Sequence, residues 1–472
     1  MQRLLHCERF SESSFIVIPI ADIEEIREID RSSQYSPEVL IERAGAAVAR
    51  SALRELGGAY GRRVVVVAGK GSNGEDGRVA ARRLQRRGVR VHLFDADESP
   101  EELPEVDLVI DAAYGTGLKR PYEAPKTNST VLSVDLPSGV DGDTGKALGR
   151  PFEAKRTLTF NALKPGHLLS EGACLSGELE IVDIGLETSS LSCGLVTSAD
   201  IQKWIPSRPQ DSHKWKSACW VIAGSNGMEG AAVLAVTAAQ RAGAGYVRFS
   251  SPEVEISELP LEAVSFPLQR SFSIDENEIK RFKSFVVGPG LGRNQEVLNG
   301  LKRLIGEIKC PVVLDGDALH AFTKNEFPKN RQIILTPHEG EFEKIMGELP
   351  SPDRINSVRE CAEKTGAVVL LKGPTTVVSD PEGKTRVINS GDQRLATAGS
   401  GDVLAGIIGA FLARGACPLE AAASGAYVHG QILSRLNSTG VVATDLVSCL
   451  IQALVELGLD KDLGVTDETD LG

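Results

Sequence analysis

The sequence predicts a two-domain α/β protein in which each domain has a largely parallel sheet covered on both faces. Its 472 residues exceed one average domain, so two large domains are expected. Short apolar strands alternate with helices or long connections in both halves, a pattern typical of parallel sheets. The alternation stops over residues 186–214 and then restarts, which indicates a linker with a boundary near Ser207. We therefore expect domains at residues 15–207 and 208–472.

The N-terminal half contains the expected elements in a regular order. After an irregular start over residues 1–14, residues 20–56 have the pattern of helices. A buried strand at 63–69 leads into a glycine-rich loop at 69–77 and a helix at 78–88. Further strands are expected at 89–94, 107–115, 131–139, 157–163 and 178–185.

The C-terminal half shows the same alternation without an alignable repeat of the first half, which indicates a separate domain and not a duplication. A strand at 220–224 leads through a glycine-rich loop to a helix at 231–245. The apolar run at 403–412 can only be a buried helix, and a second helix at 421–436 closes the domain. Further strands are expected at 246–250, 285–292, 311–319, 332–342 and 367–378.

Composition limits the possible partners. Hydrophobic residues make up 42% and charged residues 25%, and the net charge of -12 argues against nucleic acid and membrane partners. No apolar run reaches the ~18 residues needed to cross a bilayer. The eight cysteines are dispersed without zinc-ligand spacing, which indicates free thiols in a reducing compartment. The apolar stretch at 15–21 follows acidic residues, unlike a signal peptide, so we expect a cytoplasmic protein.

Gly69, Gly71 and Gly74 form a GxGxxG pattern between a strand and a helix, and Asp95 ends the next strand. This arrangement is typical of a Rossmann-like three-layer domain and would suit a dehydrogenase. Glu75 and its neighbour Asp76, however, place negative charge where a pyrophosphate would meet the helix N-terminus. A dehydrogenase is therefore only the third-ranked alternative.

Polar residues also follow the neighbouring strands. Asp111 ends one strand, and Asp135 and Ser138 follow another. Because the carboxyl ends of parallel strands meet in one crevice, Asn73, Asp111 and Ser138 are candidate oxygen ligands of a cation. One amide, one carboxylate and one hydroxyl carry little charge, which suits a monovalent ion. Taken singly each is more consistent with a turn residue, but the agreement of three strand ends favours a cation site.

The segments GSNGEDG (71–77), DAAYGTGLKRP (111–121) and SVDLPSGVDGDTG (133–145) resemble, in order, the signatures of NAD(P)H-hydrate epimerase domains. The resemblance covers about residues 20–185. It implies potassium at Asn73, Asp111 and Ser138, and proton transfer at Asp135. Ser72 and Glu75 depart from the family's usual Asn and Gly, and Glu75 adds bulk and charge to the loop. The implied substrate-binding residues are Ser72, Asn73, Gly74, Glu75, Asp76, Gly115, Thr116, Gly117, Leu118, Lys119, Arg120, Pro121 and Asp135.

A second candidate site lies before the apolar helix. The turn at 399–401 offers backbone N–H groups and a helix dipole to an anion. Asp402 beside it indicates a base next to a phosphoryl group, or else a helix cap. Lys372 is placed to neutralise a nucleotide phosphate, although it also suits a surface strand end. Phe342 stands where a second zinc-binding His would be required after His338, so a metalloprotease is excluded.

The segments HKWKSACWVIAGS (213–225), GPGLG (288–292), TPHEGEF (336–342), KGPTT (372–376) and AGSGDVLAG (398–406) resemble ribokinase-like enzymes. They are most similar to the ADP- or ATP-dependent NAD(P)H-hydrate dehydratase domain, over about residues 213–457. Gln393 and Arg394 replace a glycine-proline-glycine-methionine stretch usual in that family. The implied substrate contacts are Ala231, Gly290, Gly292, His338 and Asp402. The implied binding residues for ADP, with Mg²⁺, are Lys372, Gly373, Pro374, Thr375, Thr376, Ser400 and Gly401.

The two resemblances together imply one repair enzyme with an isomerase and a lyase activity. It would epimerise the R and S forms of hydrated NAD(P)H through Asp135, and dehydrate the S form at the expense of ADP with Asp402 as the base. We expect hydrated NAD(P)H and ADP as its small-molecule partners and a homo-oligomeric assembly. The alternative is a ribokinase-like small-molecule kinase with a catalytically silent N-terminal nucleotide-binding domain.

Overall fold

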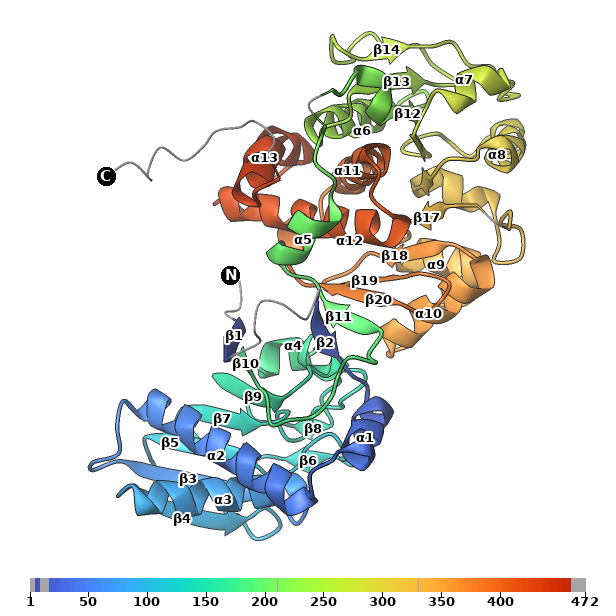
Figure 1. Cartoon of the computed structure of the whole chain (residues 1–472). Helices are drawn as coiled ribbons and strands as arrows, with labels where there is room; N and C mark the ends of the chain where they lie inside the picture. Colours follow the sequence, from blue (N-terminus) through green and yellow to red (C-terminus); the bar gives the residue numbers. More distant parts are fainter. Residues whose placement is uncertain (1–4, 9–16, 210, 330, 460–472) are drawn as a thin grey trace, which may run out of the picture. The chain divides into compact units, whose positions relative to one another are not determined.

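The computed structural model describes residues 5–8, 17–209, 211–329 and 331–459 (Figure 1). Contacts between residues divide the chain into two compact units, Met1–Gly194 and Leu195–Gly472. The predicted boundary near Ser207 lies shortly after this division, beyond helix α5 (Ser198–Trp204). Both units are built on sheets of largely parallel strands, which confirms the predicted fold class.

Unit 1 is built on a seven-stranded sheet in which all neighbouring strands are parallel. The central strands consist almost entirely of buried residues, most of them aliphatic, because both faces of the sheet are covered. The strand β1 (Leu5–Glu8) lies within residues 1–14, for which an irregular conformation was expected. In spatial order the strands are β1 (Leu5–Glu8), β10 (Glu178–Val182), β9 (Arg156–Phe160), β7 (Val131–Val134), β5 (Leu108–Ala112), β3 (Arg63–Ala68) and β4 (Arg90–Asp95).

The two faces of this sheet are covered differently. Helices α2 (Pro37–Leu56) and α3 (Ser72–Arg86) pack on one face, against a core that includes Val66. On the other face, Tyr122 and Phe152 from long connections pack on the sheet. The remaining elements are β2 (Ile18–Ile20), α1 (Ile23–Ser32), β6 (Tyr122–Glu123), β8 (Gly149–Arg150), η1 (Pro165–His167), α4 (Gly172–Leu175) and β11 (Cys193–Leu195).

Helix α3 begins at Ser72, earlier than the expected start at Arg78, so the predicted glycine-rich loop forms its first turns. Glycines are weak helix formers, which is why the pattern indicated a loop. Packing overrides this preference, because Gly74 lies directly against the end of β3. A Cβ at Gly74 would stand 1.9 Å from the carbonyl oxygen of Gly69, so only glycine allows the approach.

Unit 2 has a sheet that is parallel from β14 to β18 and continues with two antiparallel strands. The spatial order is β14 (Val264–Ser265), β13 (Tyr246–Ser250), β12 (Ala218–Ile222), β15 (Ser284–Val287), β16 (Val312–Leu314), β17 (Ile333–Leu335), β18 (Val368–Leu371), β19 (Thr376–Ser379) and β20 (Thr385–Ile388).

Helices cover both faces of this sheet. Figure 1 shows α6, α11, α12 and α13 on one side and α8, α9 and α10 on the other. The helices are α6 (Glu229–Arg241), α7 (Glu276–Lys280), α8 (Gln295–Glu307), α9 (Glu339–Met346), α10 (Arg354–Thr365), α11 (Ser400–Arg414), α12 (Pro418–Gln431) and α13 (Ala443–Glu456). The short 3-10 helices are η2 (Lys214–Ser217), η3 (Gly316–Ala321), η4 (Gln393–Leu395) and η5 (Ile432–Arg435).

Helix α11 is the buried helix that the apolar run predicts, and every residue from Val403 to Ala413 is buried. Its glycines allow close packing on two neighbours. A Cβ at Gly406 would lie 2.3 Å from the carbonyl oxygen of Ala235 in α6, and one at Gly409 would lie 2.2 Å from Val286 in β15. The middle of α11 is therefore packed closely against both the sheet and α6.

Candidate active sites

The first candidate site lies at the carboxyl ends of β3, β5 and β7, which are neighbours in unit 1. Ligands of parallel sheets bind at such edges. A Cβ at Gly115 would lie 3.5 Å from Cβ of Asn73 and 3.6 Å from Oδ2 of Asp135. The structure therefore brings together, around Gly115, two site residues that were predicted from different strand ends.

Asp111 is fully buried and holds the loop that follows β7. The hydroxyl of Ser138 donates to Oδ1 of Asp111 at 2.5 Å, and its backbone N–H donates to Oδ2 at 2.8 Å. Ser133 donates to the same carboxylate at 3.0 Å. Burial raises the pKa of Asp111, and no lysine or arginine of the described ranges forms an ion pair with it. A buried carboxylate without a countercharge favours a bound cation.

Asn73, in the first turn of α3, is a second residue whose surroundings indicate a bound ligand. Both of its amide atoms, Oδ1 and Nδ2, are buried and have no hydrogen-bond partner. Such groups are strongly unfavourable unless a ligand or water satisfies them. Asn73, Asp111 and Ser138 therefore offer an amide, a carboxylate and a hydroxyl oxygen, a donor set whose chemistry suits the predicted monovalent cation.

Asp135 is held in an unusual conformation at the end of β7. Its φ of 67° lies in the left-handed region that side-chain-bearing residues rarely adopt. The ammonium of Lys164 donates to Oδ1 at 2.5 Å, and the hydroxyl of Thr159 donates to the same oxygen at 3.1 Å. Burial raises the pKa of Asp135, but the charge of Lys164 and its hydrogen bond outweigh this and lower it. Asp135 is therefore an ionised carboxylate at neutral pH.

Sequence reasoning missed Lys164 and its neighbour His167, whose ring contacts the backbone of Asp135. A signal was available, because Lys164 directly follows the predicted strand at 157–163 and thus lies at the same sheet edge as the other candidates. The strand order puts β9 next to β7, and this adjacency brings the lysine to Asp135.

Two acidic residues of the α3 start behave differently. Asp76 is 7% exposed, and burial, followed by the charge of Asp135, raises its pKa to about 8. Glu75 is half-exposed and pairs with Arg78 at 3.3 Å. Arg78 also binds Asp95, so the residue that would hold a ribose in a dehydrogenase is part of a structural ion pair. The charge of Glu75 is therefore balanced within the loop.

The second predicted substrate loop, residues 115–121, follows β5. Hydrogen bonds of Tyr114 hold the start of this loop in place. The hydroxyl of Tyr114 donates to Asp97 at 2.8 Å and accepts from Arg120 at 3.0 Å. Gly117 and Lys119 are exposed. The loop therefore presents backbone and basic groups at the rim of the crevice.

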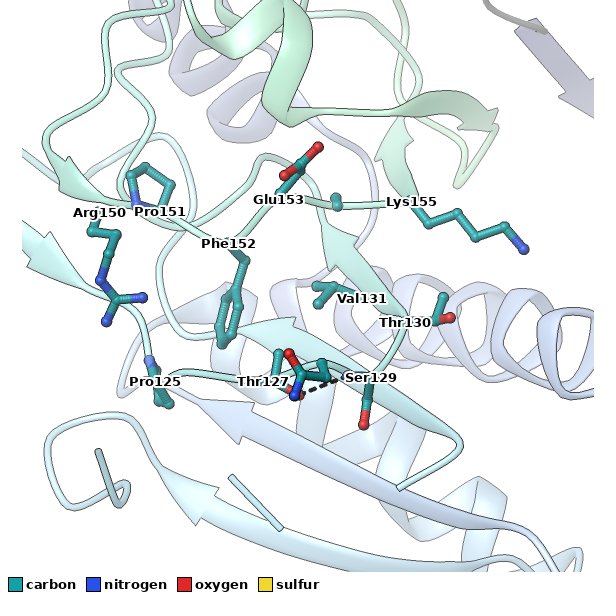
Figure 2. A pocket seen from close by; sticks show the side chains of 12 residues that line it. Pro125, Thr127, Ser129, Thr130, Val131, Arg150, Pro151, Phe152, Glu153 and Lys155 are labelled. Atoms are coloured by element: carbon teal, nitrogen blue, oxygen red, sulfur yellow. Dashed lines mark hydrogen bonds between the residues drawn. The ribbon is translucent and has the colours of Figure 1, made fainter. Parts of the chain in front are cut away.

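A cavity of about 380 Å³ lies elsewhere in unit 1, at the amino ends of β7 and β9 (Figure 2). Its two basic side chains are already paired, Lys155 with Glu55 at 2.8 Å and Arg150 with Glu123 at 3.5 Å. No predicted site residue lines it within the described ranges. The cavity is therefore separate from the candidate site.

The second candidate site lies at the start of α11 in unit 2. Lys372, after β18, donates to Asp315, after β16, at 2.9 Å, and lies 3.8 Å from Glu341. A Cβ at Gly401 would stand 3.5 Å from the Lys372 ammonium and 3.9 Å from Oδ2 of Asp315. The predicted lysine is therefore next to the predicted anion-binding turn. Sequence reasoning did not assign Asp315 or Glu341 to this cluster.

Asp402 lies inside α11, whose N-cap is Gly399, so it is not the capping residue. Burial raises the pKa of Asp402 to about 7, with the charge of Asp315 adding to the rise and Lys372 opposing it. Burial lowers the pKa of Lys372, but the carboxylates of Asp315 and Glu341 outweigh this and raise it. At neutral pH the site holds a cationic lysine and a carboxyl group suited to accept a proton.

The predicted substrate residues of unit 2 partly come together. A Cβ at Gly290 would lie 2.8 Å from Cβ of Ala231, so these two are adjacent. Leu234, one turn after Ala231 on α6, would contact a Cβ at Gly399 at 2.6 Å. Helix α6 therefore links Ala231 and Gly290 to the start of α11. The backbone N–H of Gly292 donates to Asp317 at 2.9 Å, which fixes that loop.

His338 is the N-cap of α9, and its Nδ1 accepts from the backbone N–H of Gly340 at 3.0 Å. Its Nε2 lies 3.5 Å from Glu341, and 60% of the side chain is exposed. This agrees with a hydrogen-bonded residue at a strand end, and it leaves one side of the ring open to a ligand.

Arg394, one of the two departures from the family pattern before α11, has a structural role. Arg394 binds the carboxylate of Asp392 at 2.7 Å and also donates to the carbonyl of Leu436. The hydroxyl of Ser400 donates to the carbonyl of Leu395 at 2.7 Å. These bonds hold the turn that precedes the helix.

Comparison with known proteins agrees with this division into two sites. A family model described as NAD(P)H-hydrate dehydratase matches residues 219–453, and one described as YjeF-related protein N-terminus matches residues 37–102 and 94–166. The bifunctional NAD(P)H-hydrate repair enzyme Nnr of Moorella thermoacetica is 32% identical, covering 93% of this chain and 99% of the relative. The Escherichia coli enzyme of the same name is 31% identical, with 87% and 88% covered.

The chain belongs to the bifunctional NAD(P)H-hydrate repair enzyme family. This confirms the predicted family and its pairing of an isomerase with a lyase, and it disfavours the kinase alternative. A ribokinase-like superfamily protein of Enterococcus faecalis, 22% identical, shares the fold of unit 2 with a TM-score of 0.51, covering 56% of this chain and 96% of that one. Within the described residues, none of the helices has both the length and the apolar character required to span a membrane.

Proposed function

We propose that unit 1 interconverts the two epimers of hydrated NADH or NADPH, and that unit 2 converts the S epimer back to NAD(P)H with ADP as co-substrate. The observation that carries the proposal is the cluster at the start of α11, where Lys372 and Asp402 flank the turn at Gly401. The substrate is inferred from the family to which the chain belongs, and phosphoryl transfer is inferred from the residues of this cluster.

In unit 2 the substrate hydroxyl attacks the terminal phosphoryl group of ADP. An oxygen–phosphorus bond forms, the bond to the AMP oxygen breaks, and Asp402 takes the hydroxyl proton. Lys372 and the N–H groups at the start of α11 stabilise the negative charge on the phosphoryl oxygens. Phosphate then leaves with the electron pair of its carbon–oxygen bond, and loss of a proton from the adjacent carbon restores the dihydropyridine ring.

In unit 1 the hydroxyl sits on the carbon next to the ring nitrogen, whose lone pair can expel it. Asp76, whose pKa is raised to about 8 by burial and the charge of Asp135, gives the leaving hydroxyl a proton, so that it departs as water. Water returns to the opposite face of the carbon, and Asp135 accepts its proton. Potassium, when bound, would be held by Asn73, Asp111 and Ser138 and would supply a charge that balances Asp111.

The loop at residues 72–76, with that at 115–121, would hold the nucleotide of the hydrate in unit 1. In unit 2, Ala231, Gly290, Gly292 and His338 would contact the nicotinamide, and Lys372–Thr376, Ser400 and Gly401 would bind ADP with Mg²⁺. We further propose a cytoplasmic location, because the described cysteines are free thiols, as expected in a reducing compartment. The proposed homo-oligomer can be tested by light scattering.

The decisive experiment incubates the purified chain with a mixture of NADH-hydrate epimers and ADP and follows the return of reduced nicotinamide absorbance. We expect both epimers to be consumed, with AMP and phosphate as products. Asp402→Asn should abolish dehydration while epimerisation, followed by chromatography, continues. Accumulation of a stable phosphorylated product without recovery of NADH would contradict the proposal and favour the kinase alternative.

A further inference from the structure

The turn that follows β9 contacts both the backbone and the side chain of Asp135. Lys164 donates from its ammonium to Oδ1 of Asp135 at 2.5 Å and to the Thr159 hydroxyl at 2.8 Å. The ring of His167 lies 2.7 Å, through Nε2, from the carbonyl oxygen of Asp135. The side chains of Lys164 and His167 are 2% and 0% exposed, so neither can reach the substrate directly.

The hydrogen bonds fix the protonation state of His167. Its Nδ1 accepts from the backbone N–H of Lys164 at 2.9 Å, so the ring proton lies on Nε2 and is donated to Asp135. Burial and the charge of Lys164 lower the pKa of His167 to about 4, which keeps the ring neutral. One neutral imidazole therefore ties the backbone of Asp135, in its left-handed conformation, to the backbone of Lys164.

The side chain of Asp135 is restrained in the same way. Both described donors to its carboxylate, Lys164 and Thr159, bind Oδ1. The other oxygen, Oδ2, faces Gly115 on the substrate side of the crevice. The rotation of the carboxylate is thereby limited, and one defined oxygen is presented to the reacting carbon.

We propose that Lys164 and His167 are positioning residues for epimerisation, which hold Asp135 so that Oδ2 is its reactive oxygen. The inference rests on the proposed epimerase function of unit 1. Lys164 has a second effect through its charge, since Asp30 of α1 and Asp76 of α3 are further carboxyl groups around Asp135. Lys164 is the cation that keeps Asp135 ionised among them.

The test measures the pH dependence of epimerisation for Lys164→Met, with Lys155→Met as the control. Lys155 pairs with Glu55 on the surface of the same unit. Without Lys164, Asp135 loses the charge and the hydrogen bond that contribute most to lowering its pKa, so the pKa rises and the acid limb of the profile should move to higher pH. We expect kcat to fall about tenfold or more with KM little changed. Urea unfolding of the same variant checks that unit 1 is folded, and dehydration of purified S epimer checks that unit 2 is intact.

A pair of substitutions at His167 tests the backbone contact independently. His167→Gln keeps a donor and an acceptor in one side chain, whereas His167→Phe keeps neither. We expect Gln to retain most of the epimerisation rate and Phe to lose it. The inference is overturned if Lys164→Met keeps the wild-type rate and profile, or if Gln and Phe act alike. An inactive wild type would instead reject the proposed function.

Discussion

The ammonium of Lys372 lies 2.9 Å from Oδ1 of Asp315, although the two residues follow strands separated by β17. Thr336, at the end of β17, donates to the same oxygen at 2.6 Å. Three successive strand ends therefore build one ionic cluster beneath the start of α11. The charges of this cluster determine when Asp402 can accept a proton.

Replacing Asp315 by Asn should shift the pH profile of dehydration to lower pH. Burial and the charge of Asp315 both raise the pKa of Asp402, so loss of that charge lowers it. A lower pKa leaves Asp402 ionised at more acidic pH, and the acid limb moves accordingly. The measurement is kcat against pH with purified S epimer and ADP. An unshifted acid limb would show that Asp315 does not control the base.

Asp135→Asn should separate the two activities in one progress curve. With mixed epimers and ADP, the S epimer should return to NADH at the wild-type rate, after which the reaction should nearly stop. Asp107→Asn is the matched control, because Asp107 lies before β5 and binds Arg62 at the opposite edge of the sheet. Complete consumption of both epimers by Asp135→Asn would exclude its role in proton transfer.

Asp76→Asn should stabilise unit 1, and more so at pH 8 than at pH 5. The pKa of Asp76 is about 8 in the folded chain but near its ordinary value when unfolded. The free energy of unfolding is therefore unaffected by this group below about pH 4, where Asp76 is protonated in both states. It falls as the pH rises from 4 to 8, because only the unfolded chain releases the proton readily, and it stays low above pH 8. One pKa unit corresponds to about 1.4 kcal/mol, so the gain should be a few kcal/mol. Urea unfolding at both pH values measures it, and equal gains would contradict the buried-acid interpretation.

Withdrawal of potassium should slow epimerisation several-fold. Asn73 offers two unpartnered buried amide atoms and Asp111 a buried carboxylate without a countercharge, so a cation should order both. The measurement compares potassium chloride with choline chloride at equal ionic strength. Asn73→Ala should abolish the response. A rate that is independent of the cation in the wild type would argue against a potassium site.

Much of both sites follows from local sequence signals. Asp135 directly follows an apolar strand, and Asp402 lies at the start of an apolar helix. The structure places each of them in a polar cluster at the edge of its sheet. The glycine-rich segment at 69–77 was correctly placed after β3. Its helical conformation was not predicted, because the contact between Gly74 and Gly69 that favours it is tertiary.

The partners of these residues were harder to predict because they come from distant strands. Lys164 meets Asp135 only because β9 lies beside β7, and Asp315 meets Lys372 only because β16 and β18 both flank β17. Strand order is set by which hydrophobic faces pack together, and a single sequence does not encode it in any short pattern. Ion pairs across a sheet edge are therefore the part of the site that required the structure.

The close packing of α11 on α6 has a mechanical consequence. Leu234 touches the turn at Gly399, and Ala231, on the same helix, touches Gly290. A shift of α6 would therefore move both the loop at Gly290, where we propose that the nicotinamide binds, and the turn at Gly399, which precedes the proposed phosphate site. The hydroxyl of the hydrate and the terminal phosphoryl group of ADP would therefore keep their alignment during thermal motion, because both binding segments pack against the same helix.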